Sequence, residues 1–137
     1  ECRRILRPGG KVLLTWLVRD ESTPVNRAHM DVLRAFCPNF TGLAHGYDES
    51  LPRLSRFFAS QEARAFDADA VYDRATFVRR SLSSSYALRP EDARYADFVA
   101  ALGALFDAWA EDGRVCVRTR AVCHLGAPAE PKGEENA

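Results

Sequence analysis

The sequence predicts an α/β protein, and three segments carry that prediction. Residues 12–18 are almost continuously apolar and follow a Pro8-Gly9-Gly10 break, residues 95–109 repeat apolar side chains at helical spacing, and residues 114–125 alternate. A strand without polar alternation is typical of a central parallel strand covered by helices on both faces. Because this strand already begins at residue 12 and needs neighbours, we expect the chain to be the C-terminal part of a larger α/β domain.

Composition narrows the classes of partner. The chain has 137 residues, enough for one domain, with 47% hydrophobic and 28% charged residues. Nineteen basic residues balance nineteen acidic ones, so charge gives no argument for a nucleic acid or a membrane surface as partner. No apolar run approaches the ~18 residues of a membrane-spanning helix.

The cysteines indicate a reducing compartment. Cys2, Cys37, Cys116 and Cys123 form no CxxC pair and no set of Cys and His ligands. We expect reduced thiols in a cytoplasmic protein without a metal site; a disulfide or a metal site is the alternative.

The first half of the chain is expected to form a helix end, a strand and a helix. Residues 1–7 end a helix, strand 11–18 follows, and Pro24 suits the first turn of a helix that Pro38 ends. Residues 38–60 are irregular, with a short helical turn at 51–58. A connection this long is uncommon unless it is functional.

The second half is expected to contain two strands and two helices. A strand is predicted over 63–71, then a helix over 75–82 capped by Asp73. Pro90 is expected to open the clearest helix, which runs to Trp109, and Gly113 has the place of a C′ glycine. A strand over 114–125 and a disordered polar tail over 127–137 complete the chain.

Several of these segments resemble class I S-adenosylmethionine-dependent methyltransferases. Residues 1–14, ECRRILRPGGKVLL, resemble the region around the fifth strand of that fold, with type 11 small-molecule methyltransferases as the most similar group. Trp16 and Arg19-Asp20 follow the strand as in that group. The segments 83–87, 95–107 and 112–115 resemble its C-terminal half, so the likeness covers about residues 1–126.

This resemblance implies a Rossmann-like sheet of seven strands with flanking helices and an antiparallel last strand. Residues 12–18, 63–71 and 115–124 would be strands five, six and seven, and the seventh would lie between the other two. The family's glycine-rich cofactor loop and the acidic residue after its second strand are absent from this sequence. S-adenosyl-L-methionine would therefore be the cofactor of a longer parent protein, and we expect the present chain alone to be inactive.

Candidate substrate-binding residues follow from that fold. Methyl transfer needs positioning and sometimes removal of a proton, and ligands of open α/β sheets bind at the carboxyl ends of the strands. Trp16 could form a pocket wall or pack in the core. Arg19 could hold an anionic substrate group or be a solvated loop residue. Asp20 could be a helix cap or a base, and Tyr86 could contact substrate or pack in a turn.

The chain has three histidines. His45, in the long irregular segment, is a weak candidate for a general base. His29 is expected to be partly buried and structural, and His124 structural.

Three functions remain open at this stage. The first is the substrate-side portion of a methyltransferase acting on a small molecule. The second is a non-catalytic α/β interaction or dimerisation module, with self-association through an exposed sheet edge. The third is another α/β enzyme whose cofactor motif lies elsewhere.

Overall fold

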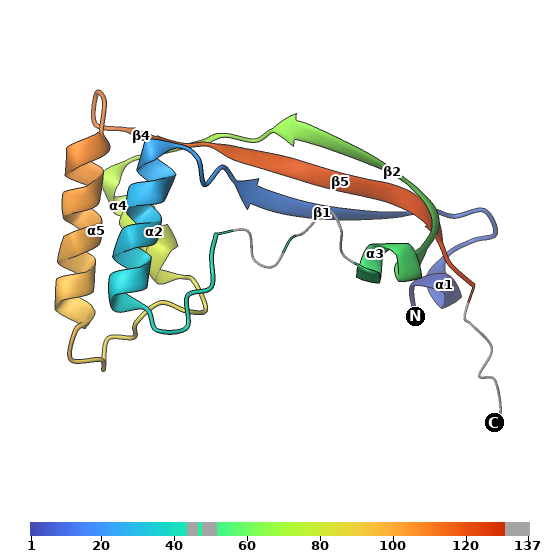
Figure 1. Cartoon of the computed structure of the whole chain (residues 1–137), viewed down its shortest axis with the longest axis horizontal. Helices are drawn as coiled ribbons and strands as arrows, with labels where there is room; N and C mark the ends of the chain where they lie inside the picture. The colour runs from blue at the N-terminus through green and yellow to red at the C-terminus, as the bar shows by residue number, and fades with distance from the viewer. Residues whose placement is uncertain (44–46, 48–51, 131–137) are drawn as a thin grey trace.

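The fold is that of a computed structural model, which describes residues 1–43, 47 and 52–130. The elements in chain order are α1 (Cys2–Ile5), β1 (Val12–Arg19), α2 (Pro24–Phe36), α3 (Pro52–Phe57), β2 (Phe58–Asp67), β3 (Ala70–Tyr72), α4 (Arg74–Leu82), α5 (Tyr95–Trp109), β4 (Val115–Val117) and β5 (Thr119–Pro128). Helices α2, α4 and α5 gather at one end, and the long strands extend away from them (Figure 1).

The long strands form a sheet in the order β1-β5-β2. Strand β5 is antiparallel to both neighbours, with His124 opposite Leu14 of β1 and Ala63 of β2. Strands β1 and β2 therefore run in the same direction on either side of β5. This confirms the α/β class and the predicted insertion of the last strand between the two earlier ones. The described strands form this sheet of three strands and a second sheet of two, β3-β4.

Two predicted strands are each divided, which corrects the expected boundaries. The strand expected over 63–71 starts at Phe58, ends at Asp67 and is followed by a separate β3, and the strand expected over 114–125 is split into β4 and β5. Both breaks meet at Asp69, whose carboxylate accepts the Thr119 N–H at 2.9 Å and a guanidinium N–H of Arg118. The chain leaves one sheet and enters the other there.

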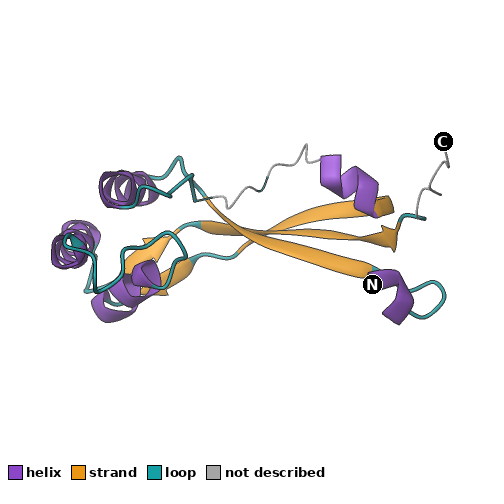
Figure 2. Ribbon diagram, turned by 90° about the horizontal axis from the view of Figure 1, so that it is seen from below, coloured by secondary structure: helices purple, strands orange, loops and turns teal. Residues whose placement is uncertain are grey.

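The helices pack around an apolar core. Fully buried side chains of α2 and α5 meet in it, and Figure 2 shows the three helices grouped beside the end of the twisted sheet. Asp73 caps α4 as predicted, because its Oδ1 accepts the Thr76 N–H at 2.7 Å. The buried core side chains contributed by α2 and α5 are Met30, Leu33, Phe98 and Leu102.

Two expectations for the α5 region are wrong. The helix begins at Tyr95, not at Pro90, because Asp92 accepts the Arg89 N–H and the preceding residues form turns. Gly113 is not a C′ glycine. Asp112 and Gly113 have φ of 48° and 71° between Glu111 and Arg114, which exchange backbone hydrogen bonds at 2.9 Å. This is the geometry of a two-residue type I′ hairpin.

Burial of β1 on both faces is also wrong for the described structure. Leu13 and Leu17 are 58% and 59% exposed, because none of the described helices covers their face of the sheet. Phe66 of β2 and Leu125 of β5 share that face. We call these four residues the open face.

The C-terminal end of β5 extends into the predicted tail. The strand continues to Pro128, and the Ala129 N–H donates to the Phe57 carbonyl at 2.7 Å. The expected tail therefore begins later than residue 127, and its residues 131–137 lie outside the described part of the chain.

Candidate functional site

Arg19, the last residue of β1, is a buried cation. Its side chain enters the space between α2 and α4 and is only 7% exposed. Nη1 of its guanidinium lies 3.5 Å from Nδ1 of His29 on α2. No Asp or Glu of the described residues forms an ion pair with it. A buried charge without a counter-charge is expensive, so this position calls for a functional explanation.

A directional hydrogen-bond relay holds the imidazole of His29. Nε2 of His29 lies 3.2 Å from Oγ of Ser81, and that hydroxyl donates to the Phe77 carbonyl at 3.0 Å. Because a carbonyl can only accept, Ser81 accepts from His29 Nε2–H. His29 Nδ1 then carries the lone pair that faces Arg19. The Ser81 hydroxyl and His29 Nε2–H are therefore both donors in this relay.

The electrostatics keep His29 neutral. Burial, followed by the nearby charges of Arg19 and Arg80, lowers the pKa of His29 to about 3. Burial and Arg80 also lower the pKa of Arg19, whereas Tyr86 and Tyr72 raise it. Positive charge is therefore concentrated on the two arginines, and the imidazole positions the Arg19 guanidinium without adding a third cation.

The other groups that act electrostatically on Arg19 are Arg80, Tyr86 and Tyr72, and all three are half-buried. The Arg80 guanidinium lies over the Tyr72 ring, 5.3 Å from its centroid, and Tyr86 packs edge-to-face on Phe40 at 5.1 Å. We use the name Arg19 site for the group made of the following residues: Arg19, His29, Tyr72, Arg80, Ser81 and Tyr86.

The predicted site residues are divided between two places. Tyr86 raises the pKa of Arg19, so these two candidates act on each other electrostatically. Trp16 points to the opposite face of β1 and contacts His124 and Tyr47, with ring centroids 5.6 and 5.5 Å away. His45 lies outside the described residues.

Asp20, the other loop candidate, is a turn residue. Its carboxylate accepts N–H and O–H from Ser22 at 2.9 and 2.6 Å, and these bonds lower its pKa. The side chain is thus occupied by the local turn and is not placed in the Arg19 site.

Sequence reasoning missed the contribution of α4. Arg80 and Ser81 belong to the last turn of α4, and Ser81 bonds to His29, which is 52 positions earlier in the sequence. The only local indication is the polar Arg79-Arg80-Ser81 segment, which also suits a solvated helix end. His29 is buried, as expected, at 2% exposure.

His124 forms a second polar cluster on the sheet. Its Nδ1 lies 2.9 Å from Oε1 of Gln61 and its Nε2 3.3 Å from the Tyr47 hydroxyl. Gln61 Oε1 can only accept, so Nδ1 carries the proton and the Tyr47 O–H donates to Nε2. Both ring nitrogens are thereby engaged, as a structural histidine requires.

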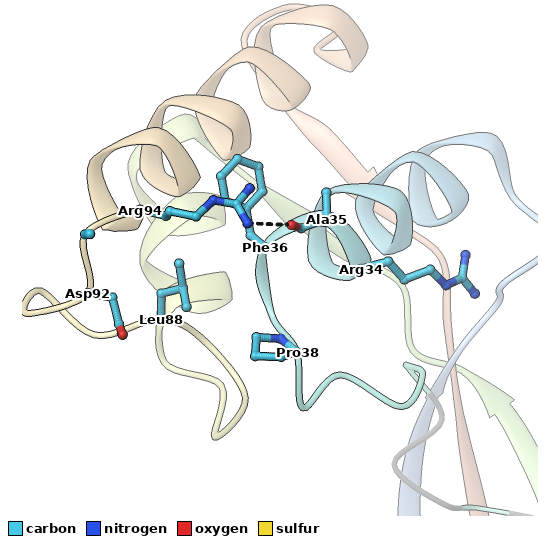
Figure 3. A pocket seen from close by; sticks show the side chains of 8 residues that line it. Arg34, Ala35, Phe36, Pro38, Leu88, Asp92 and Arg94 are labelled. Carbon is cyan, nitrogen blue, oxygen red and sulfur yellow. Dashed lines mark hydrogen bonds between the residues drawn. The ribbon is translucent and has the colours of Figure 1, made fainter.

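A groove of about 340 Å³ lies where the end of α2 meets the start of α5 (Figure 3). Arg94 crosses it, with its guanidinium 4.5 Å from the centroid of the Phe36 ring and Nη1 donating to the Ala35 carbonyl at 3.1 Å. The Arg94 guanidinium is thus already bonded within the protein, where it joins the start of α5 to the end of α2.

Other features limit the chemistry. The four cysteines are free, and the described residues contain no group of three or more metal-ligating side chains. None of the helices in the described ranges is both long and apolar enough to cross a membrane.

No protein-family model matches the chain, and no curated protein shows significant similarity to it.

Proposed function

We propose that this chain is the C-terminal, substrate-side portion of an S-adenosylmethionine-dependent methyltransferase that acts on a small molecule. The observation that carries the proposal is the sheet order β1-β5-β2, with an antiparallel last strand between two strands that run the same way. That order is the one implied for strands five, seven and six of a Rossmann-like methyltransferase sheet. On this view β1, now at the edge of the sheet, pairs with a further strand in the parent protein.

The Arg19 site has the position that a substrate site needs in this fold. It lies at the carboxyl end of β1, where open α/β sheets bind their ligands. A methyltransferase can work mainly by positioning its acceptor, and a fixed guanidinium is a positioning group. The free cysteines fit a reducing compartment, and we propose a cytoplasmic location on that ground.

The residues of this chain do not fit the cofactor. The turn after β1 has no glycine, and its polar atoms are used locally: the Asp20 carbonyl accepts from Thr23 Oγ1 at 3.0 Å and from Asn26 Nδ2 at 2.8 Å. We therefore assign S-adenosylmethionine binding to the parent protein outside this chain.

Calorimetric titration with S-adenosylmethionine tests the proposal. The titration compares this chain with the longer protein translated from a coding region extended by about 100 residues upstream, a domain-sized extension. We expect no binding to the chain and micromolar binding to the longer protein, whose extension contains a glycine-rich loop. A start codon directly before Glu1, or micromolar binding to the chain itself, contradicts the proposal.

The open face supports a second candidate, an interaction or dimerisation module. Leu13 lies opposite Leu125 across the β1–β5 pair, which places two exposed leucines side by side. Large exposed apolar patches mark association sites.

Sedimentation of the chain tests this second function. A Leu17→Lys substitution is expected to shift a self-associating chain toward monomer, because it places a charge on the open face at its β1 side. Val71→Lys is the matched control, since Val71 is similarly exposed, at 54%, but lies on β3 away from that face. A wild-type chain that is monomeric at high concentration removes the candidate.

A further inference from the structure

Among the described residues, the Arg19 site has two cations and no carboxylate counter-charge. Arg80 lowers the pKa of Arg19, and both arginines lower the pKa of His29, yet none of the ion pairs among the described residues involves Arg19 or Arg80. Removing a guanidinium from water without a counter-ion costs several kcal/mol. An anion bound beside Arg19 would offset that cost.

Donors remain available for such an anion. A guanidinium has five N–H donors, and in the described structure Arg19 uses one of them, toward His29 Nδ1. His29 is itself held by Ser81, so the plane of the guanidinium is fixed before a ligand arrives. Fixed, parallel N–H donors fit the two oxygens of a carboxylate.

The surroundings favour a carboxylate over a phosphate. Arg80 and Ser81 lie in the last turn of α4, whose dipole presents its negative end there. Phosphate sites typically use the opposite end of a helix, where free N–H groups point at the ligand. A phosphate dianion would need a further positive charge beside it, and the neutral His29 does not supply one.

The residues of the Arg19 site differ in burial. Arg19, His29 and Ser81 are buried, whereas Arg80, Tyr72 and Tyr86 are half-buried, so a ligand would have to approach from the side of these three residues. An acceptor carrying a carboxylate would place that group against Arg19 and leave its remaining atoms on the side of the two tyrosine rings.

We propose that the Arg19 site binds the carboxylate of a small organic acid, with Arg19 as the bidentate partner, Arg80 as the second cation, and His29 and Ser81 as positioning residues. The identity of this acid as the methyl acceptor rests on the proposed function above, whereas the anion site itself does not.

The test uses the whole chain and sodium benzoate, with ionic strength held constant by sodium chloride. Binding is followed by the ¹⁵N NMR signal of the Arg19 side chain and by the thermal unfolding midpoint. We expect a saturable shift of the Arg19 signal and a rise in the midpoint with benzoate. Benzyl alcohol, which has the same ring without the charge, is expected to do neither.

Variants locate the site. Arg80→Gln is expected to weaken benzoate binding about tenfold, the effect of losing one charge-assisted contact, and Arg19→Met to abolish it. Arg79→Gln is the matched control, because Arg79 is the adjacent arginine of α4 but is exposed, and its guanidinium bonds to Thr76 within its own helix. If Arg19→Met does not fold, Arg80→Gln and the wild-type NMR signal still decide.

Three results overturn the proposal. They are the absence of saturable benzoate binding to the wild type, equal binding by Arg80→Gln and Arg79→Gln, and preference for inorganic phosphate over benzoate at equal ionic strength. Because the titration contains no S-adenosylmethionine, each of these leaves the methyltransferase proposal standing. Failure of the longer protein to bind S-adenosylmethionine would conversely leave the anion site intact.

Discussion

At the scale of single residues, the buried charge of Arg19 is expected to lower the stability of the folded protein, and we explain its presence by a function. Its side chain is buried, its pKa is lowered mainly by burial, and its only described hydrogen bond is a long one to His29. A residue selected for stability would be apolar at this position. Binding sites commonly retain such unfavourable groups because the ligand completes them.

Replacing Arg19 is therefore expected to stabilise the protein without ligand. Arg19→Met removes the unpaired charge and keeps a flexible side chain of similar length, so we expect the free energy of unfolding to rise by about 1–2 kcal/mol in chloride buffer. Urea denaturation measures the change, and Arg79→Met, at an exposed position of α4, should stay within about 0.5 kcal/mol of wild type. A loss of more than about 1 kcal/mol for Arg19→Met would show that the charge is compensated in the free protein.

His29 gives a pH dependence with a defined sign. Its pKa falls from the ordinary 6.5 to about 3 on folding, so between these values the unfolded chain binds a proton that the folded chain does not. Stability is then full above pH 6.5 and decreases as the pH falls, by about 2 kcal/mol between pH 7 and 5.

The variant His29→Gln isolates this contribution. Glutamine can still bond to Ser81 but does not titrate, so the decrease between pH 7 and 5 should largely disappear in urea denaturation curves. The carboxylates with lowered pKa, such as Asp73 and Asp107, act only below about pH 4 and do not enter this window. An unchanged slope in the variant would mean that His29 is protonated in the folded protein.

At the scale of elements, the sequence predicted those features that depend on residues close together in the chain. The apolar spacing of α2 and the cap of α4 are confirmed. The division of the predicted strands was missed, because it depends on the bond between Asp69 and Thr119, which are 50 positions apart. The hairpin at Asp112-Gly113 was missed for a different reason: the same glycine satisfies a helix end and a type I′ turn.

The cap of α4 gives the prediction at this scale. Asp73→Ala leaves the Thr76 N–H without its acceptor, so we expect a loss of about 1 kcal/mol in the free energy of unfolding. Asp73→Ser keeps a capping oxygen and should lie within a few tenths of a kcal/mol of wild type. Equal losses for the two variants would indicate that the cap contributes nothing specific.

At the scale of the whole molecule, the sheet order followed from the sequence only through the resemblance. Apolar spacing identified strands near 12–18 and 114–125, but no pattern in one sequence states which strand lies between which. The Arg19 site was predicted only in part, since Arg19 and Tyr86 were candidates while Arg80 and Ser81 were not. Burial of a charged side chain depends on how helices close over a strand end, which composition does not reveal.

The open face and the free edge of β1 are the consequences of this architecture. In a larger sheet, a further parallel strand would bond to that edge, and additional helices would cover Leu13 and Leu17. Among the residues that the structure describes, none pairs with that edge of β1 or covers these leucines. This difference makes the claim that β1, β5 and β2 end a larger methyltransferase sheet directly measurable.

Hydrogen exchange of the β1 amides that do not bond to β5 tests that claim most directly, compared between this chain and the upstream-extended protein. We predict fast exchange in the chain and slowing by at least about a hundredfold in the longer protein, because the free edge becomes an interior pair. Equal, fast exchange in both proteins would show that β1 remains an edge strand and would contradict the account.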